Sequence, residues 1–320
     1  MVTNRASATS ASRTCRRPAS RCSGALAGVP AVAMAYLAEE IDGEGLGAAM
    51  GIYVAGTTIG GLAGRLIPAF TLDLASWRWA QAAAAIAAAG CTVWFVRWLP
   101  PSRGFVPRPA GIYTMLGDLA GQLRHRGLLA LFGLAFVLMG GFVSLYNYLG
   151  YRLTTAPFAL PEALVGLVFV LYLAGTAASA AAGRLTDRIG RLRVLTVSLG
   201  VMTIGLVVTV PDHLGTVLLG VLLYTAGFFG AHTAASAWVG AMAQGNRGAA
   251  SSLYLFAYYL GSALVGGAAG LAYSRAGWLG LTCGTGFLMV IAVVLLWVSH
   301  RSQRHAEHTR TGAIAVPVEV

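Results

Sequence analysis

The sequence GRLTDRIGRLR, residues 183–193, places four arginines and one aspartate within eleven residues, and apolar segments lie on both sides of it. Such a concentration of charge is unfavourable in hydrocarbon, where even one central arginine costs about 2.5–3.5 kcal/mol on insertion scales. We call residues 183–193 the charged loop. It predicts a short polar hairpin outside the bilayer that joins two membrane-spanning helices.

The composition is typical of an integral membrane protein. Hydrophobic residues make up 57% of the chain and charged residues 10%, whereas soluble domains carry about 25% charged residues. All 22 basic residues are arginine, and the net charge is +11. Because these arginines fall between apolar segments, they indicate membrane topology. We therefore expect contact with a lipid bilayer and no nucleic-acid partner.

Nine apolar segments are predicted to be membrane helices: 24–38, 47–71, 77–98, 128–151, 161–182, 192–210, 214–240, 248–272 and 277–299. The segment 24–38 also fits the apolar core of a signal peptide, but the eight spans that follow favour a first membrane helix. The expected organisation is an Arg/Ser-rich tail, a partial bundle of three helices, a proline-rich cytoplasmic linker, a six-helix bundle and a polar cytoplasmic tail: residues 1–23, 24–98, 99–127, 128–299 and 300–320.

The distribution of arginine predicts the orientation of the chain. Arginines gather in the linker, in the charged loop, at Arg247 and in the tail, which all lie on one side of the predicted spans. We expect this side, and with it the C-terminus, to be cytoplasmic in a multi-pass protein of the cell membrane. Nine spans would then place the N-terminus outside, with its five arginines. That conflict with the positive-inside bias indicates that part of the first bundle is missing.

An internal repeat supports the same interpretation. Gly47 and Tyr53 recur as Gly248 and Tyr254, at an offset of 201 positions. Two related helical halves are typical of transporters. At this offset the counterpart of the charged loop would precede residue 1. We expect an N-terminally truncated transporter that lacks three helices, or a chain whose first two dozen residues come from a wrong start or reading frame.

The spacing Gly-x-Leu-x-Asp-Arg-x-Gly-Arg in the charged loop resembles the signature loop of the major facilitator superfamily. Residues 28–37 and 139–148 are similar to the drug-exporter branch of that family often called YnfM-like. The resemblance implies an all-α integral membrane fold of two bundles, with about nine of the usual twelve helices present. It also implies a monomer that moves a small molecule by alternating access and uses no cofactor.

Residues 56–61, GTTIGG, look like the antiporter motif of that family, with Thr57 in place of its proline. Close approach of two helices is the alternative explanation for these glycines. The acids Glu39 and Glu40 lie in the turn after the first span. The resemblance implies that they would face a basic loop of the first half.

The resemblance makes five residues a conformational latch: Gly183, Asp187, Arg188, Gly190 and Arg191. The glycines permit a tight turn and close helix contact. Asp187 lies near the start of the span 192–210, where helix amides favour an anion. The resemblance implies a further bond to the start of the span 248–272, and pairing of the arginines with acids or lipid phosphates. The alternative is a loop of positive charge that only sets topology.

Polar and aromatic residues at helical spacing predict a weakly polar pathway without fixed charge: Tyr53, Thr57, Tyr146, Asn147, Tyr254 and Tyr258. Such a pathway suits lipophilic or modestly cationic compounds. His232 lies in the middle of the span 214–240. It is either a proton relay, because imidazole titrates near neutral pH, or a neutral histidine bonded to a neighbouring helix.

The function that these patterns favour is secondary active transport, with proton-coupled efflux of lipophilic compounds as the leading form. Metabolite uptake by the same fold and an inactive truncated fragment are the alternatives. A membrane-embedded enzyme is disfavoured, because the sequence has no clustered catalytic residues, metal-ligand spacing or nucleotide-binding loop. We expect no metal site.

Overall fold

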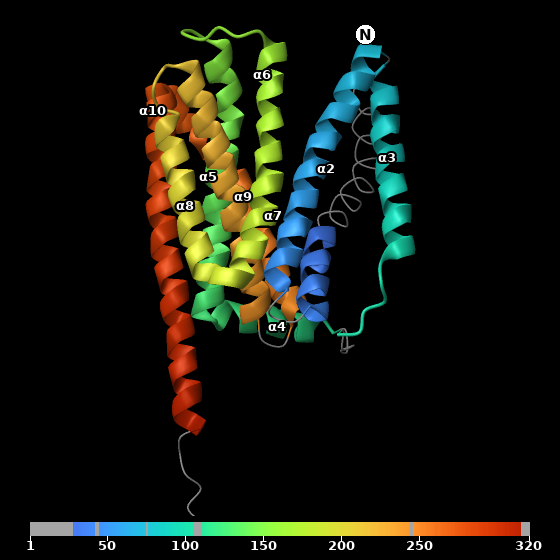
Figure 1. The fold of residues 1–320 in the computed structure, drawn as a ribbon, viewed down its shortest axis with the longest axis vertical. Coiled ribbons are helices and arrows are strands. Elements are labelled where there is room, and N and C mark those ends of the chain that lie inside the picture. The colour runs from blue at the N-terminus through green and yellow to red at the C-terminus, as the bar shows by residue number, and fades with distance from the viewer. Residues whose placement is uncertain (1–27, 42–44, 75, 105–110, 244–245, 315–320) are drawn as a thin grey trace, which may run out of the picture.

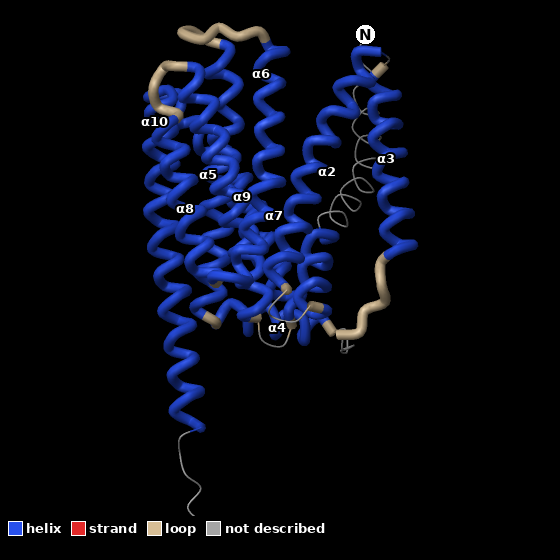
Figure 2. Tube along the Cα trace, viewed as in Figure 1, coloured by secondary structure: helices blue, strands red, loops and turns tan. Residues whose placement is uncertain are grey.

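A computed structural model describes residues 28–41, 45–74, 76–104, 111–243 and 246–314. The described parts are almost wholly helical and contain no strand (Figure 2). Residues 28–40 are helical, and the following elements are α2 (Leu46–Leu74), α3 (Trp77–Trp98), α4 (Ile112–Arg124), α5 (Arg126–Thr154), α6 (Glu162–Val168), η1 (Phe169–Leu171), α7 (Tyr172–Ile189), α8 (Arg191–Val208), α9 (Leu214–Met242) and α10 (Arg247–Ile314). The prediction of an all-α architecture is confirmed.

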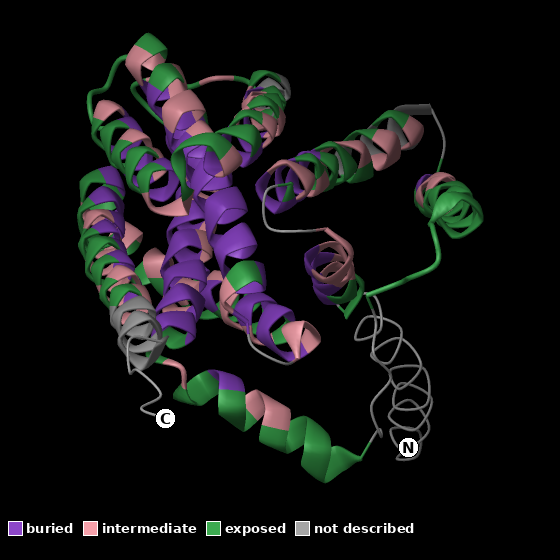
Figure 3. Cartoon of the chain, turned by 60° about the horizontal axis from the view of Figure 1, so that its bottom comes forward, coloured by how far each residue is buried: buried purple, intermediate pink, exposed green. Residues whose placement is uncertain are grey.

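The helices form two groups of unequal size. Residues 28–40, α2 and α3 make the smaller group, and α5–α10 make the larger one (Figure 1). Helices α2 and α7 provide the main contact between them. They converge at the end that holds the charged loop and diverge toward the opposite end. Buried residues gather inside the larger group (Figure 3).

Length and apolar character allow six of the described helices to cross a membrane. Helix α10 contains two of the predicted spans, because Ala276 and Gly277 leave helical geometry and divide it. Helix α3 has 22 residues, or about 33 Å, close to the roughly 30 Å of a hydrocarbon core. It exposes tryptophans at both ends, which are Trp77, Trp79, Trp94 and Trp98. Tryptophan favours both membrane–water interfaces, so α3 has the features of a lipid-facing span.

The charged loop differs from the expected hairpin. Helix α7 continues to Ile189 and α8 begins at Arg191, so only Gly190 separates them. Gly190 has a φ of +90°, a conformation that glycine adopts without a Cβ penalty. The predicted short hairpin between two helices is therefore a turn at Gly190 alone, and most of its charged residues belong to the ends of α7 and α8. A helix satisfies its own backbone hydrogen bonds, so α7 can carry exposed arginines to its last turn.

Two segments that were expected to be irregular contain helix. Helix α4 lies within the predicted linker, and α10 continues from the last span through the predicted tail to Ile314. In α4, the apolar residues Ile112, Leu116, Leu119 and Leu123 recur at spacings of three or four. This period is typical of an amphipathic helix, and the prolines before it obscured the pattern.

Arg152 joins three elements at the end of the larger group opposite the charged loop. Its buried guanidinium donates to the backbone carbonyls of Thr209, Val210 and Pro211 and to the Asp212 carboxylate. It also lies 4.6 Å from the ring centroid of Trp278. The last carbonyls of a helix lack partners within the helix, so Arg152 closes the end of α8 from outside.

We expect Arg152→Met to lower the free energy of unfolding by about 2 kcal/mol, because hydrogen bonds to charged groups contribute roughly 1.5–3 kcal/mol. Chemical unfolding in mixed micelles measures this change. Asp212→Asn is the matched control, since the Asp212 side chain is 69% exposed and an exposed ion pair contributes about 0–1 kcal/mol. Equal effects of the two substitutions would contradict the assignment.

Candidate functional site

Asp187 binds the beginning of α2. Its carboxylate accepts hydrogen bonds from the Gly47 and Ala48 amides, at 2.9 and 2.8 Å. Helix α2 begins at Leu46, so both donors belong to the first turn, whose N–H groups have no partner within the helix. The positive end of the helix dipole also favours the carboxylate. Asp187 therefore links the two helix groups through two charge-assisted bonds.

The prediction that Asp187 bonds to the start of the span 248–272 was wrong. Gly47 and Gly248 are equivalent positions of the internal repeat, and the structure pairs Asp187 with the first of them. The physical reason is that α7 lies against α2 in the other helix group. Arg247, at the start of α10, instead donates to the carbonyl of Ala38.

Glycines let α2 and α7 touch backbone to backbone beside Asp187. A Cβ atom at Gly183 would lie 2.4 Å from the Gly47 oxygen and 2.8 Å from the Gly51 Cα. A Cβ atom at Gly51 would lie 2.5 Å from the Ser179 oxygen. Gly47 and Gly51 form the spacing Gly-x-x-x-Gly, which is typical of close helix pairs in membranes. This pattern was visible in the sequence and was missed.

The remaining latch candidates lie around this contact without joining it. Gly190 forms the turn between α7 and α8, and Arg188 is exposed on the last turn of α7. Arg191 is half-buried at the first position of α8. The glycines of the antiporter-like segment do not mediate close contact, since a Cβ atom at Gly56 or Gly60 would meet no atom within 4 Å.

Glu40 fastens the segment after α3 to the helix of residues 28–40. Its carboxylate accepts hydrogen bonds from the Ser102 hydroxyl and from the Arg103 and Gly104 amides. The Ser102 bond, followed by the two amide bonds, lowers the pKa of Glu40 below its ordinary value. Burial, the largest cause, raises the pKa of the neighbouring Glu39. Glu40 therefore binds the chain that leads into the linker, where a basic loop was expected.

Aromatic side chains from four helices form a cluster inside the larger group: Phe142, Tyr146, Tyr172, Phe228, Phe229, His232, Tyr254 and Tyr258. We call this set the aromatic cluster. The Phe142 and Phe228 rings stack at 3.9 Å, and the Tyr146 hydroxyl lies 2.7 Å from the Thr225 hydroxyl oxygen. Three of the predicted pathway residues thus meet in one place.

His232 lies at one end of this cluster. Its Nδ1 is 2.9 Å from the Tyr254 hydroxyl, and its ring centroid is 4.8 Å from that of Tyr258. The imidazole is buried, with 7% of the residue exposed. The arrangement joins an imidazole to a phenol that can donate or accept a proton.

The other predicted pathway residues lie outside the aromatic cluster. Asn147 is exposed, and Tyr53 donates to the Pro30 carbonyl at 3.3 Å. Thr57 is exposed and its hydroxyl donates to the Val54 carbonyl of its own helix at 2.7 Å. The sequence analysis missed Phe142, Tyr172, Phe228 and Phe229, which an aromatic count at helical spacing along α5, α7 and α9 could have found.

Comparison with known proteins gives matches along most of the chain. The family model of the Major Facilitator Superfamily matches residues 20–161 and 152–319. The Inner membrane transport protein YnfM of Escherichia coli (strain K12) is 43% identical over 276 residues, which are 86% of this chain and 66% of that protein. The Uncharacterized MFS-type transporter YybF of Bacillus subtilis (strain 168) is 39% identical over 275 residues, 86% of this chain and 67% of that protein.

Two solved structures share the fold. The human organic anion transporter MFSD10 aligns with a TM-score of 0.66 at 18% identity, over 82% of this chain and 66% of that chain. A bacterial homologue of the iron transporter ferroportin, in an outward-facing state, aligns with a TM-score of 0.62 at 14% identity, over 82% of this chain and 65% of that chain. The chain spans about two thirds of the length of the relatives that it matches. The expected likeness to the YnfM-like branch is confirmed.

Proposed function

The chain belongs to the Major Facilitator Superfamily, and from this premise we propose that it moves a small molecule across the cell membrane by alternating access. In this proposal the charged loop, the linker and the C-terminus face the cytoplasm, because arginine gathers on that side. The three-helix segment 24–98 and the six-helix segment 128–299 act as the two moving bodies. The relatives that the chain matches include transport proteins.

One observation carries this proposal. The two helix groups touch through Gly47, Gly51 and Gly183 and are bonded by Asp187 at one end, whereas α2 and α7 diverge toward the other end. In this proposal, a site between the two groups opens toward the end where α2 and α7 diverge. Breaking the Asp187 bonds would release the closed end, so we assign Asp187 and the two glycines of α7 and its turn, Gly183 and Gly190, to a conformational latch.

The chemistry of the aromatic cluster suggests the class of substrate. Its side chains are aromatic and weakly polar, and the cluster contains no carboxylate or arginine. Aromatic faces attract apolar groups and cations. We therefore propose lipophilic compounds, neutral or modestly cationic, as substrates, with Tyr146, Tyr254 and Tyr258 in contact with them. Tyr53, Thr57 and Asn147 lie outside the cluster, and we assign them no contact with the substrate.

We further propose that His232 takes up and releases one proton in each transport cycle, with Tyr254 as its hydrogen-bond partner. Proteoliposomes with the purified chain and a lipophilic cationic dye test the direction of coupling. An acidic lumen drives dye accumulation if dye and proton exchange. An acidic exterior drives it if they move together, as a proton-coupled uptake permease requires.

In this assay we expect His232→Gln to abolish gradient-driven accumulation and Tyr254→Phe to slow it about fivefold, because the loss of one hydrogen bond of about 1 kcal/mol changes a rate by roughly that factor. Tyr224→Phe is the matched control, since the buried Tyr224 hydroxyl has no hydrogen-bond partner within the described structure. Equal rates for all three variants would remove His232 from the mechanism. Absence of accumulation by the unmodified chain under either gradient would instead indicate an inactive fragment.

A further inference from the structure

A cavity of about 540 Å³ lies in the larger helix group, at the end that carries the charged loop. Its volume falls within the range of roughly 300–1,000 Å³ that is typical of small-molecule sites. The start of α8, the end of α9 and the extension of α10 beyond its last span line it. The cavity is separate from the aromatic cluster and shares none of its residues. We call it the basic pocket.

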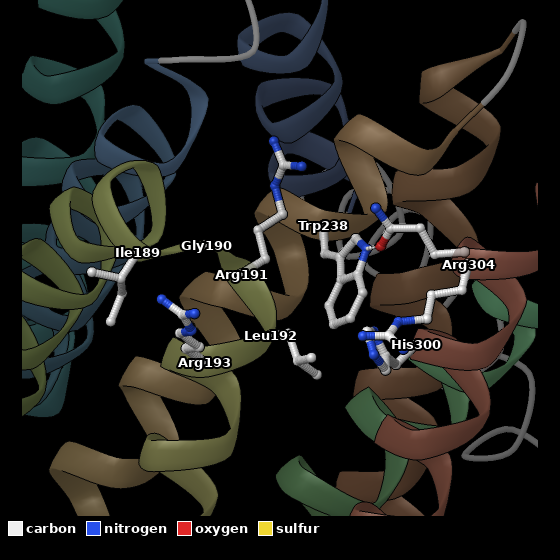
Figure 4. A pocket seen from close by; sticks show the side chains of 9 residues that line it. Ile189, Gly190, Arg191, Leu192, Arg193, Trp238, His300 and Arg304 are labelled. Atoms are coloured by element: carbon white, nitrogen blue, oxygen red, sulfur yellow. Dashed lines mark hydrogen bonds between the residues drawn. The ribbon is translucent and has the colours of Figure 1, made fainter. Parts of the chain in front are cut away.

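The side chains around the basic pocket are mostly positive or polar. Arg191, Arg193 and Arg304 line it together with His300, and its lining contains no carboxylate. Figure 4 shows Trp238 between Arg191 on one side and Arg304 and His300 on the other. Asp187, which lies outside the lining, attracts Arg191, but the lining itself carries three guanidinium groups and no carboxylate, so its potential is positive. A positive lining of this kind favours an anion, and arginine binds phosphate through parallel hydrogen bonds.

The extension of α10 builds one wall of this pocket. His300, Gln303 and Arg304 follow one another at helical spacing, so they share one face of the helix. The Trp238 indole nitrogen donates to the Gln303 side-chain oxygen at 3.0 Å, which holds this face against the end of α9. The basic groups are therefore positioned by helix packing and by a hydrogen bond.

Two further features at the opposite wall indicate an anion. The Nε atom of Arg191 is buried and has no hydrogen-bond partner among the residues that the structure describes. Gly190, which precedes α8, offers no side-chain cap to the first-turn amides of that helix. Uncapped amides at a helix start favour an anion through their N–H groups and the helix dipole.

We propose that the basic pocket binds a phosphate group, carried by an anionic lipid of the adjacent leaflet or by a free phosphate in solution. Its position at the end of the apolar spans, with Trp238 and Leu192 in its wall, suits a group at the membrane–water boundary. Basic pockets between membrane helices bind lipid head groups by the same chemistry. The proposal does not depend on transport activity.

The test uses the purified full chain in detergent. Native mass spectrometry measures retention of phosphatidylglycerol against phosphatidylcholine, and equilibrium dialysis measures binding of inorganic phosphate. The variants are Arg193→Gln and Arg304→Gln, each exposed enough to be replaced without disturbing the core. Arg301→Gln is the matched control, because Arg301 lies on α10 beside Arg304, packs at 3.9 Å from the Trp297 ring centroid and does not line the pocket.

We expect the unmodified chain and Arg301→Gln to bind the same phosphate ligand, and Arg193→Gln and Arg304→Gln to bind it at least tenfold more weakly. Selective retention of phosphatidylglycerol identifies a lipid as the source, and binding of inorganic phosphate alone identifies a soluble anion; either result with this variant pattern supports the site. Equal weakening by Arg301→Gln and Arg304→Gln would overturn it, as would absence of binding in both arms. Size-exclusion profiles and circular dichroism confirm that each variant is folded.

Discussion

Gly183→Leu is expected to force α2 and α7 apart. Even the first carbon of a side chain at this position would lie 2.4 Å from the Gly47 oxygen, a backbone atom that cannot rotate away. Overpacking costs typically 1–3 kcal/mol, and at about 3 kcal/mol the touching state loses roughly a hundredfold in population. Separation of the helices should expose Ser179, which is fully buried on α7 near Gly51.

Labelling of a cysteine at position 179 by a membrane-permeant maleimide measures this change, in a chain whose four natural cysteines have been replaced. We expect Gly183→Leu to accelerate labelling at least tenfold. Gly60→Leu on α2 is the matched control. It raises helix propensity by the same amount, but a Cβ atom at position 60 would meet no other atom within 4 Å. Labelling as slow in Gly183→Leu as in Gly60→Leu would show that the close contact is not required.

Asp187→Asn is expected to release the start of α2 while the shape of the side chain is kept. The carboxylate accepts from two amides, whereas a carboxamide offers one oxygen and turns an N–H group toward the second donor. Loss of the charge also removes its interaction with the helix dipole. Together these effects amount to about 3 kcal/mol, or roughly a hundredfold in the population of the bonded state.

Hydrogen exchange at the Gly47 and Ala48 amides reports this prediction directly, because these two groups donate to Asp187. We expect their exchange to accelerate by about two orders of magnitude with helical content unchanged. Asp212→Asn removes the same charge at the other end of the molecule and should leave both amides protected. If both amides exchange as slowly in Asp187→Asn as in the unmodified chain, the charged loop sets membrane topology only and is not a latch.

Composition and hydrophobic spacing were sufficient to predict the helical membrane fold, because a bilayer admits few other backbone arrangements. Individual side chains were harder to place. Tyr146 joins the aromatic cluster and Asn147 does not, since consecutive helix residues point about 100° apart. Thr57 satisfies its hydroxyl within its own helix, as threonine often does, so its polarity was no evidence of a pathway.

Contacts between distant segments were not accessible to the sequence analysis. The partner of Asp187 depends on which helix of which half packs against α7, and the internal repeat offers both Gly47 and Gly248 as equivalent candidates. The basic pocket depends on α10 remaining helical beyond its last span, where only a polar tail was expected. The Gly-x-x-x-Gly spacing of α2 was readable, but its partner on α7 needed the structure.

Alternating access is tested most directly by two distances in one chain. One pair of spin labels, at Ile52 on α2 and Leu185 on α7, flanks the closed end, and a second pair, at Phe70 on α2 and Tyr151 on α5, lies toward the opposite end; all four side chains are exposed. Pulsed electron paramagnetic resonance should show that Asp187→Asn lengthens the distance between the labels at positions 52 and 185 and shortens the distance between those at positions 70 and 151. Distances that stay the same in that variant, or that both change in one direction, would contradict the account.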